Sequence, residues 1–225
     1  MSKVVHPFAH RLGIIRDWKS RWFAVDGGYR ANLRSDIRLR EFLKKELRGM
    51  YVAGLDLERN AKTLRVIIKT SRPGMIIGRG GDGSTRLRTK IAEILRKEKM
   101  PMPEIKLDIE EVRSPESNSA IVAYMVAEGL EKRMPFRRVM KQTVEKVMAN
   151  RDVKGVRISL GGRLGGGDMA RTEELKRGRV PLQTFRADID YTREKAYLPY
   201  GVIGIKVWIY RGDIFADAAK QSAAK

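Results

Sequence analysis

The sequence predicts an α+β fold made of two domains, each with helices packed against a sheet. Segments in which apolar and polar residues alternate, as in half-buried strands, are interspersed with segments of helical period. The chain has 225 residues, which is enough for two modest domains with cores of their own. A junction marked by Ser114 and Pro115 separates two sets of such segments. We therefore expect domains at residues 31–113 and 114–212.

The composition favours a polyanionic partner. Lys and Arg number 47 against 27 Asp and Glu, a net charge of +20, which suits nucleic acid or an anionic membrane. No stretch reaches the ~18 apolar residues of a membrane span, and no signal-peptide core is present, so we expect a soluble, cytoplasmic protein. There is no cysteine, and the two histidines, His6 and His10, lie in a probable tail. We expect no metal and no cofactor.

The first 30 residues are predicted to form a basic and aromatic arm. Trp18, Trp22 and Phe23 are interleaved with Arg and Lys, without a sustained period. Two interpretations stay open at this point. The rings contact RNA or a neighbouring protein, or the arm folds back onto its own domain.

In residues 31–113 the predicted order is helix, strand, strand, short helix, loop, helix, strand. The first helix uses apolar residues at helical spacing, and Gly49 ends it. The two strands form a hairpin, Pro73 opens the short helix, and Pro101 and Pro103 end the last one. The apolar residues of the first helix are Leu33, Ile37, Phe42, Leu43 and Leu47. The later elements span residues 51–58, 63–70, 73–77, 82–99 and 104–112.

The glycine-rich loop between the paired helices allows several interpretations. Gly78, Gly80 and Gly83 satisfy the dinucleotide fingerprint, but that motif requires a strand directly before its first glycine, and residues 73–77 intervene. Gly78 and Gly83 followed by Ser84 resemble a P-loop, but the required lysine is missing. A plain glycine turn is a further alternative. The remaining interpretation is the Gly-x-x-Gly loop of a KH domain, which binds single-stranded nucleic acid by its backbone.

The order of the flanking elements favours the KH interpretation. Backbone N–H groups of the loop and the amino terminus of the next helix would meet phosphates, Arg79 would add a charge, and the bases would lie in an apolar groove beside the third strand. Asp82 could instead cap that helix. The predicted RNA-binding residues of this loop are Arg72, Gly78, Arg79, Gly80 and Gly81.

Residues 114–212 are predicted to form a second α+β domain with an antiparallel sheet. A helix begins at Ser114-Pro115, and a second runs over 136–150. A short helix is expected at 170–176, and residues 213–225 form a flexible tail. The expected strands are 153–160, 183–191, with Phe185 facing inward, and 202–211.

Basic residues of this second domain are candidates for RNA contact. Arg137, Arg138 and Lys141 share one helix face, which is either a solvated surface or a phosphate-binding one, and the charge excess favours the second. We call these three residues the basic cluster. A second glycine-rich loop at 161–167 suits RNA backbone or a tight turn of the sheet. The further candidates are Arg163, Gly165, Gly166, Arg171, Arg177 and Arg179.

Several blocks in order along nearly the whole chain resemble the S-three family of bacterial small-subunit ribosomal proteins. The blocks are His6-Pro7, Arg11-Leu12-Gly13, Arg72-Pro73-Gly74, Ile77-Gly78, Phe136-Arg137-Arg138, Met140-Lys141, 162–166, Ala170-Arg171, 178–182, 186–191, 200–204 and 206–209. The chain departs from the family at Gly80, where the loop usually carries a second basic residue. It also departs at 174–176, which lacks the aromatic residues often found there.

The resemblance implies a type II KH domain (α-β-β-α-α-β) and a carboxy-terminal domain in the head of the small subunit. It implies binding to 16S ribosomal RNA and contact with the tenth and fourteenth proteins of the head. It also places the chain where messenger RNA enters, near the fourth and fifth proteins, with the basic cluster helping to unwind messenger structure. It implies no enzyme activity, no small-molecule substrate and no membrane. The alternatives are a free KH-domain regulator outside the ribosome and, more remotely, a nucleotide-dependent helicase.

Overall fold

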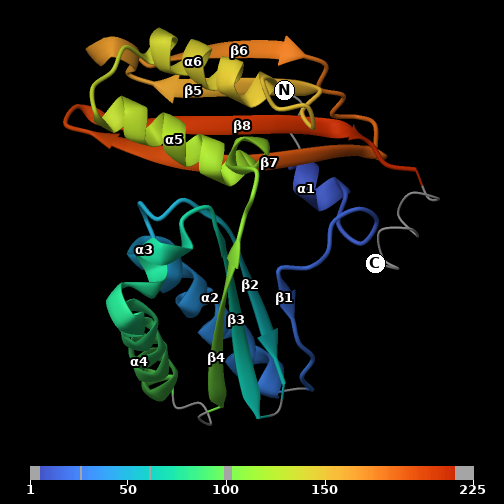
Figure 1. The fold of residues 1–225 in the computed structure, drawn as a ribbon, viewed down its shortest axis with the longest axis vertical. Helices are drawn as coiled ribbons and strands as arrows, with labels where there is room; N and C mark the ends of the chain where they lie inside the picture. Colours follow the sequence, from blue (N-terminus) through green and yellow to red (C-terminus); the bar gives the residue numbers. More distant parts are fainter. Residues whose placement is uncertain (1–5, 26, 61, 99–102, 216–225) are drawn as a thin grey trace. The chain divides into compact units, whose positions relative to one another are not determined.

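The computed structural model describes residues 6–25, 27–60, 62–98 and 103–215 (Figure 1). It divides into two compact units. One is Trp18–Arg113, and the other joins Met1–Asp17 to Ser114–Lys225. Where a separate arm of 30 residues was expected, the structure places residues 6–17 with the second unit and the residues after them with the first.

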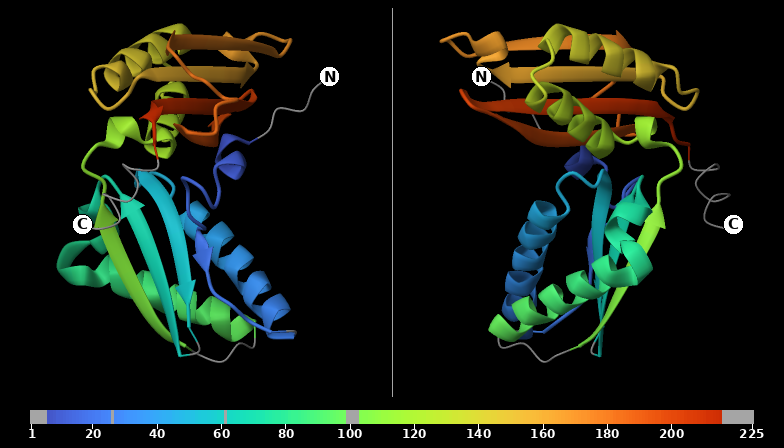
Figure 2. Two further views of the ribbon diagram at one scale, coloured as in Figure 1. Left: turned by 90° about the vertical axis from the view of Figure 1, so that its right-hand side faces the viewer. Right: turned by 60° about the vertical axis from the view of Figure 1, so that its left-hand side comes forward.

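The first unit has the predicted order of elements. A four-stranded sheet, in the order β1-β2-β3-β4, is covered by helices on one face (Figure 2). Strands β2 and β3 form the antiparallel hairpin, whereas β4 runs parallel to β3, because the chain crosses over through the helices between them. The elements are β1 (Ser20–Arg21), α2 (Gly27–Glu46), β2 (Val52–Arg59), β3 (Thr63–Thr70), α3 (Pro73–Ile77), η1 (Arg79–Gly81), α4 (Asp82–Lys97) and β4 (Glu104–Glu111).

Helix α2 differs from the prediction in its start and in the face that it buries. It begins at Gly27, and the predicted core residues Leu33 and Ile37 are 40% and 49% exposed. The buried stripe instead includes Asp36, which accepts a hydrogen bond from Arg59 of β2 at 2.9 Å. This buried ion pair turns a polar position inward, which hydrophobic periodicity alone does not reveal. The other buried positions described in α2 are Ser35, Leu39 and Leu43, and buried Leu47 follows directly after the helix.

The second unit is a four-stranded antiparallel sheet, in the order β6-β5-β8-β7, with α5 and α6 on one face (Figure 1). Alternate residues of β5 and β8 pack under these two helices, which gives the unit its own core. Its elements are α1 (Pro7–His10), η2 (Pro115–Ser117), α5 (Ser119–Glu131), α6 (Phe136–Met148), β5 (Gly155–Gly162), η3 (Leu164–Gly166), β6 (Arg171–Gly178), β7 (Ala187–Leu198) and β8 (Gly201–Asp213).

Three expectations for this unit are wrong. The segment 170–176 is not a helix but lies in strand β6, where Leu175 pairs with Ile158, so sheet pairing overrides the helix propensity of Glu-Glu-Leu-Lys. The strand expected at 183–191 begins only at Ala187, and Phe185, expected to face inward, is 55% exposed. The helix predicted from Pro115 begins at Ser119. The tail predicted at 213–225 lies largely outside the described residues.

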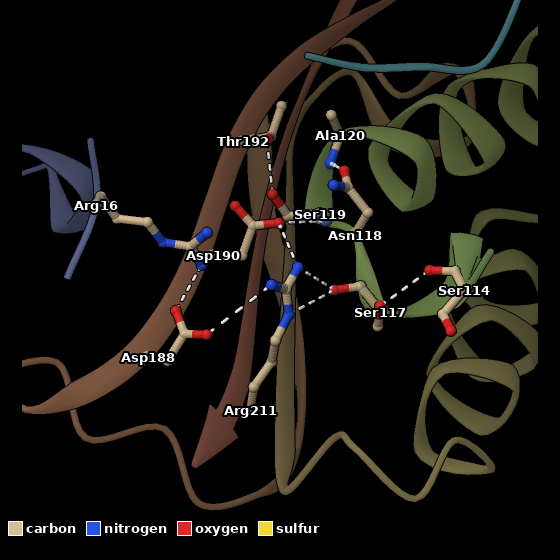
Figure 3. Close-up of polar contacts among 10 residues, drawn as sticks. All are labelled: Arg16, Ser114, Ser117, Asn118, Ser119, Ala120, Asp188, Asp190, Thr192 and Arg211. Atoms are coloured by element: carbon tan, nitrogen blue, oxygen red, sulfur yellow. Dashed lines mark hydrogen bonds and ion pairs between the residues drawn. The ribbon is translucent and has the colours of Figure 1, made fainter. Parts of the chain in front are cut away.

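Polar contacts fix the start of α5 (Figure 3). Asn118 has an extended backbone, and its side chain accepts a hydrogen bond from the N–H of Ala120 at 3.0 Å, as an amino-terminal cap does. Asp190 of β7 accepts a second bond, from the N–H of Ser119 at 2.8 Å. The hydroxyls of Ser119 and Thr192 lie 2.6 Å apart. The helix therefore begins four residues after Pro115 because its first turn is bound to the sheet.

Residues 6–17 fold back onto the second unit. Arg11 is fully buried, and its guanidinium donates to the carbonyl oxygens of Ala187 at 2.6 Å, Thr184 at 2.9 Å and Leu182 at 3.2 Å. Burial lowers the pKa of Arg11, and the charge of nearby Asp188 opposes this shift. Arg16 donates to Asp188 at 2.5 Å. Of the two interpretations of the arm, folding back holds for this part.

Candidate nucleic-acid interface

The predicted KH loop is a tight, exposed turn between α3 and α4. Gly78, Gly80 and Gly81 have φ angles of 72°, 60° and 87°, in the left-handed region that glycine adopts without strain. A Cβ at Gly83 would lie 2.4 Å from the carbonyl oxygen of Ile76, so the two helix ends approach too closely for any side chain. Glycine is thus required here by the backbone itself.

The loop leaves the amino terminus of α4 without a side-chain cap. Gly81 is the capping residue, and the hydroxyls of Ser84 and Thr85 donate to its carbonyl oxygen, at 2.7 and 3.2 Å. Asp82 lies in the first turn, and its side chain forms no hydrogen bond or ion pair with any described residue, so the alternative in which it caps the helix is wrong. Uncapped N–H groups at a helix start attract anions.

The two arginines predicted for this site differ in their surroundings. Arg79 is exposed, lies in η1 between the glycines, and pairs with no acid in the described ranges. The guanidinium of Arg72 instead lies 4.3 Å from the centre of the Tyr51 ring, in a cation–π contact. The structure therefore groups Arg79 with the loop backbone and gives Arg72 a packing contact of its own.

The face of the first sheet that lies away from the helices is not basic. Its acids on β2 and β4 pair with two cations of β3, Arg65 with Asp108 and Glu58, and Lys69 with Asp56. On the helix-facing side of β4, Ile105, Leu107 and Ile109 are only partly buried. The Gly-x-x-Gly side thus combines Arg79, which has no ion pair among the described residues, with partly open apolar residues of β4.

The basic cluster lies on the exposed face of α6, but its members are not equivalent. Arg138 and Lys141 form no ion pair with any residue that the structure describes. Arg137 makes two hydrogen bonds with Glu173 of β6, both at 3.3 Å, and its guanidinium lies 5.6 Å from the Phe136 ring. The bond from Arg137 is the main cause that lowers the pKa of Glu173, and the same bond raises the pKa of Arg137.

The second glycine-rich loop is held by its own arginine. Arg163 donates to the carbonyl oxygens of Gly167 at 2.9 Å and Tyr200 at 3.2 Å, and to Asp168 at 3.2 Å. Gly165 and Gly166 have φ angles of 70° and 81°. These contacts agree with the interpretation as a tight turn at the end of the sheet.

The remaining candidates lie along and just beyond β6. Arg171 lies 3.5 Å from Glu173 and 5.7 Å from the Phe136 ring, so Glu173 contacts both Arg171 and Arg137. Arg177 and Arg179 are exposed and pair with no acid in the described part of the chain. Glu173 is not among the predicted site residues, because a helix at 170–176 does not place it beside Arg137. Strand alternation would have placed Arg171 and Glu173 on one face, beside α6.

No group of three His, Cys, Asp or Glu among the described residues could hold a metal ion. No described helix is long and apolar enough to cross a membrane.

Comparison with known proteins agrees with this architecture. Residues 38–117 match the KH domain family, and residues 126–209 match the family described as ribosomal protein S3, C-terminal domain. The chain is 44% identical over 222 residues to small ribosomal subunit protein uS3 of Caldicellulosiruptor bescii, covering 99% of this chain and 97% of that protein. It is 45% identical over 221 residues to uS3 of Syntrophomonas wolfei, covering 98% and 94%. It is 42% identical over 214 residues to uS3 of Clostridium novyi, covering 95% and 94%. The chain therefore belongs to the family of small ribosomal subunit protein uS3.

Proposed function

We propose that this chain, a non-enzymatic constituent of the small ribosomal subunit by its family, binds 16S ribosomal RNA in the head and holds messenger RNA where it enters. The KH loop would bind RNA backbone through Gly78–Gly81 and Arg79. The basic cluster would hold messenger phosphates while translocation supplies the work, so any unwinding is passive. The neighbouring partners would be the tenth and fourteenth proteins of the head and the fourth and fifth proteins beside the channel.

The exposed cations of α6 are the observation that carries the proposal. Arg138 and Lys141 are three residues apart on one helix face, and no described acid neutralises either of them. Unpaired cations on one surface repel each other and attract a polyanion. Glu145, the one acid of α6, lies a turn after Lys141 but forms no ion pair with it, so the face keeps its positive charge.

The basic cluster is tested by the triple substitution Arg137→Ala, Arg138→Ala and Lys141→Ala in assembled subunits. We expect normal assembly and slower translation through a stable messenger hairpin. The matched control is Lys132→Ala, Lys146→Ala and Arg151→Ala, which also removes three exposed cations of the same unit, from outside the cluster. Unchanged passage through the hairpin would refute the role at the channel.

The KH loop is tested separately by Arg79→Asp. An exposed loop charge costs the fold little, so we expect weaker RNA binding with an unchanged free energy of unfolding. The difference should shrink as salt is raised, because a phosphate contact is screened. Equal binding across the salt titration would remove this residue from the site.

A free KH-domain regulator is not favoured by the family. Sedimentation of the tagged chain with assembled subunits tests this alternative.

A further inference from the structure

The sheet of the second unit has a second face, opposite α5 and α6, whose charges play no part in the proposal above. On each strand the residues between the core positions point to this side. We call it the open sheet face. One end of it is closed by α1, where His6 lies 4.7 Å from the Tyr191 ring. Across its centre lie Lys176 of β6, Arg157 of β5, Lys206 and Trp208 of β8, and Tyr191 and Arg193 of β7.

Cations on this face stand directly opposite each other across strands. Lys206 pairs in register with Arg193, and Arg157 pairs with Lys176. Side chains opposite each other in an antiparallel sheet are close neighbours, and like charges at such positions destabilise the sheet. Two such pairs on one face therefore cost the isolated protein stability.

Among the described residues, an acid neutralises a member of only one of these like-charge pairs, that of Arg157 and Lys176. Arg157 donates to Glu174 at 2.5 Å and lies 4.9 Å from the Trp208 ring. Lys206, Arg193 and Lys176 are exposed and form no ion pair with any residue in the described ranges. The side chains named on this face carry four cationic groups against the single acid Glu174.

We propose that the open sheet face binds the sugar–phosphate backbone of double-helical RNA. Phosphates would neutralise the pair of Lys206 and Arg193, which no acid among the described residues relieves. The rings at the centre of the face are not open to bases, since Trp208 is 5% exposed and Tyr191 is partly buried beneath its neighbours. Recognition of single strands relies on base stacking on open rings, whereas duplex RNA is bound through its backbone and shape. Cations spread over four strands therefore fit a duplex.

This surface is distinct from the basic cluster, which lies on α6 on the other side of the sheet. The basic cluster and the open sheet face can therefore lose RNA binding independently of each other. Loss of the basic cluster should weaken the binding of single strands and leave duplex binding by the open sheet face in place. Loss of the cations of the open sheet face should weaken duplex binding and leave the binding of single strands in place.

The test uses the full chain with Lys206→Gln and Arg193→Gln together. The ligands are an RNA hairpin of about 16 base pairs, the span of a typical duplex-binding module, and a single strand of equal length. We expect hairpin affinity to fall on the order of tenfold at low salt and the slope of log affinity against log salt to fall by about 2, because two phosphate contacts are lost. Single-strand affinity should stay within twofold or so of the wild-type value.

The matched control is Lys146→Gln with Arg151→Gln, which removes the same charge from exposed positions on and beside α6. It should leave hairpin affinity unchanged. The thermal midpoint of the Lys206→Gln, Arg193→Gln variant should equal or exceed that of the wild type, because a like-charge pair is removed. Unchanged hairpin affinity in this variant would overturn the proposal. An equal loss for hairpin and single strand, or loss only of binding to an acidic protein, would overturn the assignment to duplex RNA.

Discussion

Arg211, near the end of β8, donates two hydrogen bonds to the carbonyl oxygen of Ser117, which lies 94 residues earlier, at 3.1 and 2.8 Å (Figure 3). The same guanidinium lies 3.3 Å from Asp190, and Asp190 in turn accepts from the N–H of Ser119. Asp188 lies 3.9 Å from Arg211 and also binds Arg16. One arginine of the last strand thus joins the turn before α5 to β7, and through Asp188 to the amino-terminal segment.

The first prediction follows from that contact. Arg211→Ala leaves the carbonyl oxygen of Ser117 without its donor and leaves Asp190 with the N–H of Ser119 alone. Hydrogen bonds that involve charged groups contribute about 1.5–3 kcal/mol each. Because the side chain is about a quarter exposed and water can replace part of it, we expect a loss near ~2 kcal/mol in the free energy of unfolding of the second unit. Urea unfolding followed by tryptophan fluorescence measures it. Arg211→Lys keeps the charge but not the two parallel bonds, and should recover less than half of the loss.

The KH loop gives a prediction about two glycines. Gly83→Ala places a Cβ where the carbonyl oxygens of Ile76 and Ile77 lie, so the α3–α4 turn must open, and we expect both lower stability and weaker RNA binding. Gly74 has open space around its missing Cβ, and Gly74→Ala should leave both unchanged or raise stability slightly. Thermal melts measure the stability of the two variants, and RNA titration measures their binding. Equal behaviour of the two would mean that the turn tolerates a side chain.

Glu173 should limit how strongly Arg137 binds phosphate. Its pKa is lowered, so it is ionised at pH 7 and competes with RNA for the Arg137 guanidinium. Glu173→Gln removes that charge, and we expect tighter binding of single-stranded RNA with a steeper salt dependence. In the background Arg137→Ala the same substitution should have a smaller effect, confined to the release of Arg171. A gain of equal size in that background would show that Glu173 acts by general charge rather than through Arg137.

The raised pKa of Tyr210 predicts that the second unit loses stability at alkaline pH. Burial, followed by the hydrogen bond that its hydroxyl donates to Asp213 at 2.8 Å, raises the pKa of Tyr210 above the ordinary value of about 10. A raised folded-state pKa stabilises the fold below pH ~10, and this contribution is lost as pH rises through the raised value. The stability advantage of the wild type over Tyr210→Phe should therefore narrow above pH ~10, by at most about 1.4 kcal/mol per pH unit. A gap that is constant with pH would contradict this.

Most of the first unit could be predicted from sequence because local patterns and tertiary packing agree there. The alternation of Leu64, Val66 and Ile68 gave β3 its buried face, and Pro73 and the glycines marked the paired helices. The buried face of α2 could not be predicted from period alone. It depends on Arg59 meeting Asp36, a contact between residues 23 positions apart.

The second unit was harder to predict where distant strands decide the structure. The segment 171–178 has the composition of a helix, and only its pairing with β5 makes it a strand. Helical spacing was enough to place the three residues of the basic cluster on one face. The difference between Arg137 and the other two could not be predicted, because Glu173 contacts Arg137 from β6. The buried hydrogen bonds of Arg11 could not be predicted either, because its carbonyl acceptors at 182–187 lie some 170 residues away in the sequence.

The discontinuous second unit sets an order of events during synthesis. Residues 6–17 are synthesised long before residues 182–187, which supply the carbonyl groups that bind Arg11. At roughly 5–20 residues per second, the leading segment waits on the order of ten seconds or more without its binding site, while the sequence of the first unit is already complete. Residues 6–17 thus stay undocked until the carbonyl groups of residues 182–187 have been synthesised, and their docking is a late step in the folding of the second unit.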